Sequence, residues 1–156
     1  MSMSEDMVRP YKGDPFVGHL ETPVSAGVGM VLVNNLPAYR ANLSPARRGL
    51  EVGMAHGYLL LGPFYKLGPL RDSDLALAAG LLAAIGLVVI LTVCLSLYGS
   101  VTFQKTAGSG NDLQSAQGWS DFTSSFLLGG CGGAGFAAGL LFSLEMLQGI
   151  SGNLFN

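Results

Sequence analysis

A run of 24 residues from Leu75 to Tyr98 contains no charged side chain. At the helical rise of about 1.5 Å per residue, such a run is roughly 36 Å long, which is enough to cross a hydrocarbon core of about 30 Å. Inside lipid the backbone must satisfy its own polar groups, so a segment of this kind crosses as a helix. The run therefore predicts a membrane-spanning helix over about 75–103.

The composition also indicates a membrane protein. Charged residues make up 12% of the 156 residues and glycine occurs 23 times, whereas a soluble domain usually carries about twice that share of charge. The formal net charge of −2 argues against a nucleic-acid partner, because no basic stripe is present to meet phosphates. The start of the chain lacks the features of a signal peptide or an arginine-rich transit peptide.

A second helix is predicted before this span. Ser44 can cap a helix and Pro45 is tolerated at the first helical position, so a helix is expected over about 45–66. Pro63 is expected to bend or end its last turn. The residues before it, 1–44, are interrupted by prolines and are expected to form an irregular extramembrane segment.

A third helix is predicted from Ser120 or Asp121 to about 148, with Trp119 at the membrane interface. Residues 104–118 are expected to be a loop, and Asp72 or Asp74 is expected to cap the 75–103 helix. The prediction is thus an all-α membrane protein, with an N-terminal segment (1–44) and a three-helix transmembrane domain (45–156).

The distribution of lysine and arginine predicts the orientation. Three spans place the two termini on opposite sides, and the side rich in these residues is the cytoplasmic equivalent. One side receives six of them and the other two, namely Arg9, Lys12, Arg40, Arg47, Arg48 and Lys105 against Lys66 and Arg71. The N-terminus is therefore expected on the cytoplasmic or stromal side and the C-terminus on the lumenal side.

The 120–148 segment is unusually rich in glycine. Small residues let helices approach closely in lipid, so tight helix packing is the favoured interpretation. The alternative is that the glycines leave flat space for a planar cofactor. The residues concerned are Gly129, Gly130, Gly132, Gly133, Gly135 and Gly139.

The 45–66 helix carries the side chains most relevant to chemistry. Glu51 and His56 lie within an apolar context, and ionisable residues in a membrane are candidates for function. Arg47 or Arg48, four and three residues earlier, can neutralise Glu51. His56 lies deeper, between Gly53 and Gly57, which we expect to leave room for a planar ring.

Glu51 and His56 are five residues apart and therefore about 140° apart around a helix, so they cannot bind one ion together. Each can supply one axial ligand to a separate metal centre, since imidazole nitrogen and carboxylate oxygen both ligate metals. The alternative is structural: His56 hydrogen-bonds a neighbouring helix, and Glu51 pairs with arginine at the headgroups. No nucleophile–base pair, HExxH motif or phosphate loop is present, so an enzyme is not expected.

Several long motifs resemble photosystem I reaction-centre subunit XI of the cyanobacterial type. They span Tyr11–Pro23, Asn35–Arg40, Leu43–Asp74 and Gly152–Asn156. The resemblance implies a non-catalytic photosystem I subunit in a thylakoid-type membrane that binds chlorophyll a and beta-carotene. It further implies contacts with the photosystem I core and small subunits, with membrane lipid, and with copies of itself at the centre of a trimer.

The resemblance also assigns roles to single residues. It makes Glu51 and His56 the axial ligands of two chlorophyll magnesium ions. It places a calcium ion at the trimer contact, with the Asp72 carboxylate and the Pro69 carbonyl among its ligands. The pigments of such a subunit are expected to pass excitation to a larger core.

Two other functions stay open at this level. One is a membrane scaffold that binds no pigment. The other is a transporter subunit with Glu51 and His56 on a proton path.

Overall fold

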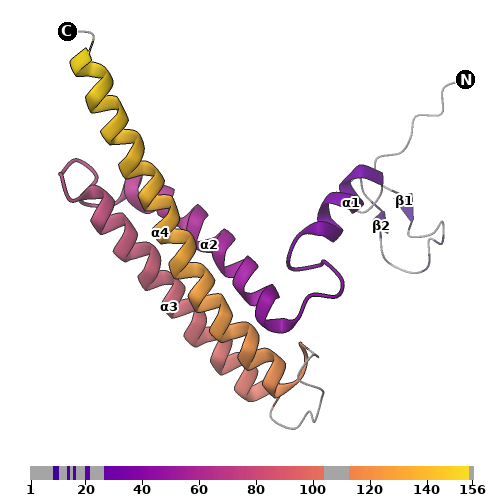
Figure 1. The fold of residues 1–156 in the computed structure, drawn as a ribbon. Helices are drawn as coiled ribbons and strands as arrows, with labels where there is room; N and C mark the ends of the chain where they lie inside the picture. Colours follow the sequence, from indigo (N-terminus) through magenta and orange to yellow (C-terminus); the bar gives the residue numbers. More distant parts are fainter. Residues whose placement is uncertain are drawn as a thin grey trace, which may run out of the picture. The chain divides into compact units, whose positions relative to one another are not determined.

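The computed structural model describes residues 9–10, 14, 16, 20–21, 27–103 and 113–154. The chain divides into two compact units, Met1–Leu43 and Ser44–Asn156, and each is described here by itself (Figure 1).

The first unit contains regular structure, so the expectation of an irregular segment is wrong for part of it. Strands β1 (Arg9–Pro10) and β2 (Leu20–Glu21) pair antiparallel, with Arg9 opposite Glu21. Helix α1 (Gly27–Asn35) follows. This stretch contains no proline and it ends shortly before Pro37, which disfavours helical backbone in the residue before it.

Helix α2 (Pro45–Leu67) begins as predicted. The Ser44 Oγ accepts a hydrogen bond from the Arg47 backbone N–H at 3.3 Å, and Pro45 occupies the first helical position. Pro63 does not end the helix, which runs on to Leu67, where the Gly68 N–H donates to the Phe64 carbonyl.

Helix α3 (Ala76–Thr102) matches the predicted span closely, but its start differs. Leu75 is the residue at the N-cap, and no side chain makes a capping hydrogen bond there, so capping by Asp72 or Asp74 is wrong. The Ala76 N–H instead donates to the Ser73 carbonyl at 3.0 Å.

Helix α4 (Ala116–Leu154) is longer than predicted at both ends. It begins before Ser120 because the Ser115 Oγ accepts from the Gly118 N–H at 3.0 Å and so caps it. It also continues through Gly149 without stopping. Residues 104–112 of the predicted loop lie outside the described residues.

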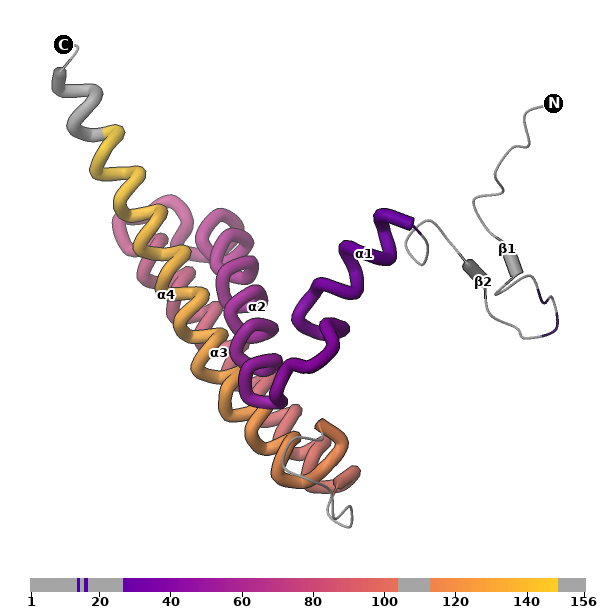
Figure 2. The backbone as a smooth tube through the Cα atoms, turned by 45° about the vertical axis from the view of Figure 1, so that its right-hand side comes forward, coloured from indigo at the N-terminus to yellow at the C-terminus, as the bar shows by residue number. Residues whose placement is uncertain are grey.

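The three long helices alternate in direction and lie side by side (Figures 1 and 2). Gly49 and Gly57 of α2 face Phe122 and Gly130 of α4, so the residue numbers rise together and these two helices are parallel. Gly80 of α3 faces Tyr65 near the end of α2, which makes α3 antiparallel to both.

The α2 and α4 backbones are in direct contact. A Cβ atom added at Gly49, Gly53 or Gly57 would overlap backbone atoms of α4, and one added at Gly129 or Gly133 would overlap backbone atoms of α2. The packing interpretation is therefore confirmed for these glycines. By contrast, a Cβ added at Gly132, Gly135 or Gly139 would meet nothing within 4 Å.

Apolar side chains from all three helices form the rest of the core. Leu61 of α2 is buried against Ala137 and Ala138 of α4, and Ala84 and Val88 of α3 are fully buried.

Two described helices, not three, are long and apolar enough to cross a membrane. They are α3 and the Ala116–Gln148 part of α4. Helix α2 is not among them, because charged and polar residues are spread along its whole length, from Arg47 and Glu51 through His56 to Lys66. By this measure, two of the three predicted spans are found.

Replacing Gly57 with Ala should destabilise the helical unit, because the new Cβ would overlap the Gly130 carbonyl. We expect a loss of about 1–3 kcal/mol, typical of overpacking. Thermal unfolding of the chain in detergent, followed by circular dichroism, measures it.

The matched control is Gly62→Ala in the same helix. A Cβ at Gly62 meets nothing within 4 Å, and alanine favours a helix over glycine by about 1 kcal/mol. Equal melting temperatures for the two variants would contradict the close packing of α2 on α4.

Candidate functional site

His56 is oriented by its own helix. Its Nδ1 lies 2.8 Å from the Val52 carbonyl oxygen, one turn earlier. A carbonyl only accepts, so Nδ1 carries the proton and donates it. In a neutral imidazole this leaves a lone pair on Nε2, the atom that can ligate a metal.

The surroundings of His56 differ from the expectation. Gly53 and Gly57 are covered by the α4 backbone, so the expected room for a planar ring beside them is wrong. The His56 side chain is itself exposed, and its ring meets Phe126 edge-on, with centroids 5.6 Å apart and planes at 63°. A ligand would therefore approach from the exposed side of α2, away from the glycine stripe.

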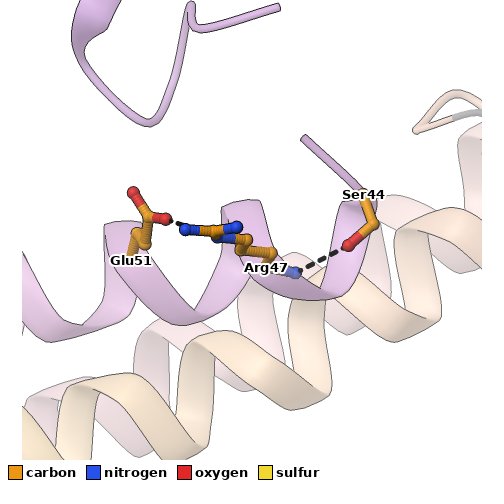
Figure 3. Close-up of polar contacts among 3 residues, drawn as sticks. All are labelled: Ser44, Arg47 and Glu51. Atoms are coloured by element: carbon orange, nitrogen blue, oxygen red, sulfur yellow. Dashed lines mark hydrogen bonds and ion pairs between the residues drawn. The ribbon is translucent and has the colours of Figure 1, made fainter. Parts of the chain in front are cut away.

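Glu51 pairs with one of the two arginines considered. The Arg47 Nε donates to the Glu51 Oε1 at 3.0 Å across one helical turn (Figure 3). The Arg47 side chain is 69% exposed and that of Glu51 is 26% exposed. Such an exposed pair adds at most about 1 kcal/mol to stability. Its main effect is to neutralise the carboxylate while leaving it near the helix surface.

The structure keeps Glu51 and His56 apart. Both lie on the continuous helix α2, so they project about 140° from each other. In the described part of the chain, no three His, Cys, Asp or Glu side chains gather where they could hold a metal ion. Each residue can therefore offer any metal only a single ligand from this helix.

Asp72 and Pro69 lie in the short connection between α2 and α3. The Asp72 side chain is 85% exposed, and its Oδ2 is 3.5 Å from the Arg71 Nε. The backbone hydrogen bonds of this turn use the carbonyls of Gly68 and Leu70. Asp72 and Pro69 alone offer too few oxygens for calcium, which takes six to eight.

One polar contact was not predicted. The Tyr65 hydroxyl of α2 donates to the Glu145 Oε1 of α4 at 2.7 Å, and the Lys66 Nζ lies 4.5 Å from the centroid of the Tyr65 ring. The signal was available, since Glu145 is the one charged residue between Phe122 and Asn156. The contact links the C-terminal end of α2 to α4.

Comparison with known proteins identifies the family. The family model described as photosystem I reaction centre subunit XI matches residues 7–146. A protein of that name from Thermosynechococcus vestitus is 53% identical over 99% of this chain and 100% of its own length. One from the alga Porphyra purpurea is 54% identical over 97% of this chain and 99% of its own length.

A third relative of the same name, from Synechocystis sp., is 53% identical over the full length of both chains. The family model and these relatives cover nearly the whole sequence, including both α2 and the connection to α3. The chain therefore belongs to the photosystem I reaction centre subunit XI family.

Proposed function

We propose that this photosystem I subunit spans the photosynthetic membrane three times and binds chlorophyll a and beta-carotene without catalysing a reaction. The observation that carries the pigment proposal is His56. Its Nδ1 proton is held by the Val52 carbonyl, and the remaining lone pair on Nε2 belongs to an exposed side chain on a helix packed against an apolar one.

Packing supports α2 as the third span. Gly49, Gly53 and Gly57 lie against the Phe122–Ala134 part of α4, which is within the segment apolar enough to cross a membrane. Helix α2 therefore lies at the same depth. Its charged residues are near its ends, where long side chains can reach the headgroups.

Three alternating spans, together with the lysine and arginine count of the connections, support an N-terminus on the stromal side and a C-terminus on the lumenal side. Arg47 and Arg48, at the start of α2, are then stromal, and Lys66 at its end is lumenal.

The chain's contribution is to hold and orient pigments. Bound chlorophyll absorbs light and exchanges excitation with its neighbours. Val52 fixes the His56 tautomer, and Arg47 balances the charge of Glu51, which presents oxygen to a second chlorophyll magnesium. Exposed apolar side chains such as Leu59 and Leu82 offer surface for beta-carotene.

Replacing His56 with Leu should remove one chlorophyll per copy of the subunit, because the imidazole ligand is lost. Pigment extraction and absorption spectroscopy of the purified complex measure the change. Leu67→Ala is the control: Leu67 is an exposed side chain on the same helix, but it offers no ligand. An unchanged chlorophyll count in His56→Leu would refute the assignment.

Two substitutions distinguish whether Glu51 is a chlorophyll ligand or only an ion-pair partner of Arg47. Glu51→Gln should largely keep its chlorophyll, because an amide oxygen can still bind magnesium, whereas Glu51→Leu should lose it. The same pigment count serves as the measurement. If both variants keep every chlorophyll, Glu51 acts only as a partner of Arg47.

Assembly of copies at the centre of a trimer is the second part of the proposal. Gly132, Gly135 and Gly139 of α4 have open space beside them, so another helix can approach there closely. The exposed Asp72 carboxylate and the Pro69 carbonyl are oxygen ligands suited to calcium. Since one connection cannot complete the ion's shell, water or a neighbouring copy must supply the rest.

Replacing Asp72 with Ala should weaken the trimer and abolish its sensitivity to a calcium chelator. Native mass spectrometry of the purified complex, with and without chelator, measures the oligomeric state. Asp74→Ala is the control, because it removes a carboxylate from the same connection. A trimer insensitive to the chelator would refute the ion, and a complex with this subunit at its periphery would refute the assembly.

A further inference from the structure

The end of α3 and the start of α4 form a partly open cavity of about 470 Å³, within the size range of small-molecule sites. Hydroxyl side chains from both helices line it, and the described lining includes no charged residue. The hydroxyl residues are Thr92, Ser96 and Ser100 of α3 and Ser120, Thr123 and Ser124 of α4.

Four of these hydroxyls already donate their single O–H group in a hydrogen bond to a backbone carbonyl of their own helix. A hydroxyl has one proton to donate and two lone pairs that accept, so these four can offer a ligand only acceptors. The bonds run from Thr92 to the Val88 carbonyl (2.8 Å), Ser96 to Thr92 (2.9 Å), Ser100 to Leu97 (2.8 Å) and Ser124 to Asp121 (3.2 Å).

Trp119 also lines the cavity, but its indole N–H is used in the same way. It donates to the Leu95 carbonyl at 2.8 Å. Trp119 can therefore offer a ligand the apolar surface of its ring but no hydrogen-bond donor. A matching ligand must itself bring several hydrogen-bond donors.

Thr123 supplies a second, independent indication. It is 5% exposed, and within the described part of the chain its Oγ1 has no hydrogen-bond partner. Burying a polar group without a partner is unfavourable. Rotation to another staggered χ1 moves the hydroxyl to the position that the methyl now occupies, while the methyl moves to the position of the Cβ hydrogen. A polar ligand in the cavity can thereby gain a hydrogen bond that the protein itself does not make.

We propose that this cavity binds the headgroup of a neutral glycolipid, with the sugar hydroxyls donating to the serine and threonine oxygens. The described lining has no lysine or arginine to neutralise a phosphate, and Asp121, which follows Ser120 in the chain, is acidic. The site lies at the ends of α3 and α4, where headgroups lie if these helices cross the membrane. The glycolipid proposal therefore rests on the proposed function, because it requires α3 and α4 to cross the membrane.

Photocrosslinking in the purified photosystem I complex tests the site directly. Three lipids with the same photoreactive acyl chain are compared: monohexosyl diacylglycerol, phosphatidylcholine and phosphatidylglycerol. The first is neutral with many donors, the second has no net charge and no hydroxyl donors, and the third has donors with a negative charge. We expect the glycolipid to label the Thr92–Ser100 and Ala116–Leu127 peptides at least about five-fold more than either phospholipid.

A double variant, Ser96→Ala with Ser124→Ala, should reduce glycolipid labelling of these peptides about five-fold, and the near-isosteric Thr123→Val should reduce it too. Ser143→Ala is the control. This variant also removes a hydrogen bond from a serine hydroxyl to a carbonyl of its own helix, here that of Gly139 at 2.8 Å. Because Ser143 is not among the residues that line the cavity, labelling should not change.

Equal labelling by all three lipids, preference for either phospholipid, no labelling, or labelling unaffected in the double variant would each overturn the proposal. The chlorophyll content of the same preparations is measured in parallel. Pigment loss in His56→Leu tests the proposed function and does not depend on the labelling result, so failure of one is distinguishable from failure of the other.

Discussion

Close contact between the α2 and α4 backbones is the interaction on which the rest of the helical unit depends. Gly49, Gly53 and Gly57 on one side and Gly129 and Gly133 on the other leave no space for even a Cβ atom. In lipid, helices gain little from burying apolar surface and associate mainly by close packing. The two glycine stripes therefore set the parallel arrangement and the register of α2 against α4.

This register determines which side chains of α2 remain exposed. With its glycine face against α4, His56 is held at the surface of α2 by its bond to Val52. Glu51 is paired with Arg47 within one turn of the same helix. Each of the two side chains thus has a hydrogen-bond partner one turn earlier in α2 itself.

In α3 and α4, the polar side chains lie mainly toward the ends of the helices. Their hydroxyl residues cluster at the end where the two helices are joined, around the cavity that Trp119 also lines. At the opposite end of α4, Glu145 contacts Tyr65 of α2. The middle of the bundle is formed by small apolar residues such as Ala84, Val88 and Ala134. Polar groups of these two helices thus lie toward the two ends of the helical unit, and apolar residues lie between them.

The sequence by itself determined the membrane class, the three long helices and the start of α2, because uncharged length and the Ser44-Pro45 pair act locally. It also singled out Glu51 and His56, since ionisable residues are rare in apolar segments. The predicted start of α4 was too late, because Ser115 caps the helix before Ser120 or Asp121 can do so. Helix α1 was not predicted, because it lies in a short stretch between Pro23 and Pro37. Only the tertiary structure decided which glycines are covered and which are open, because a helix stripe does not reveal its partner. The same holds for the Tyr65–Glu145 contact and the hydroxyl-lined cavity, whose residues are far apart in sequence and meet only when the helices pack.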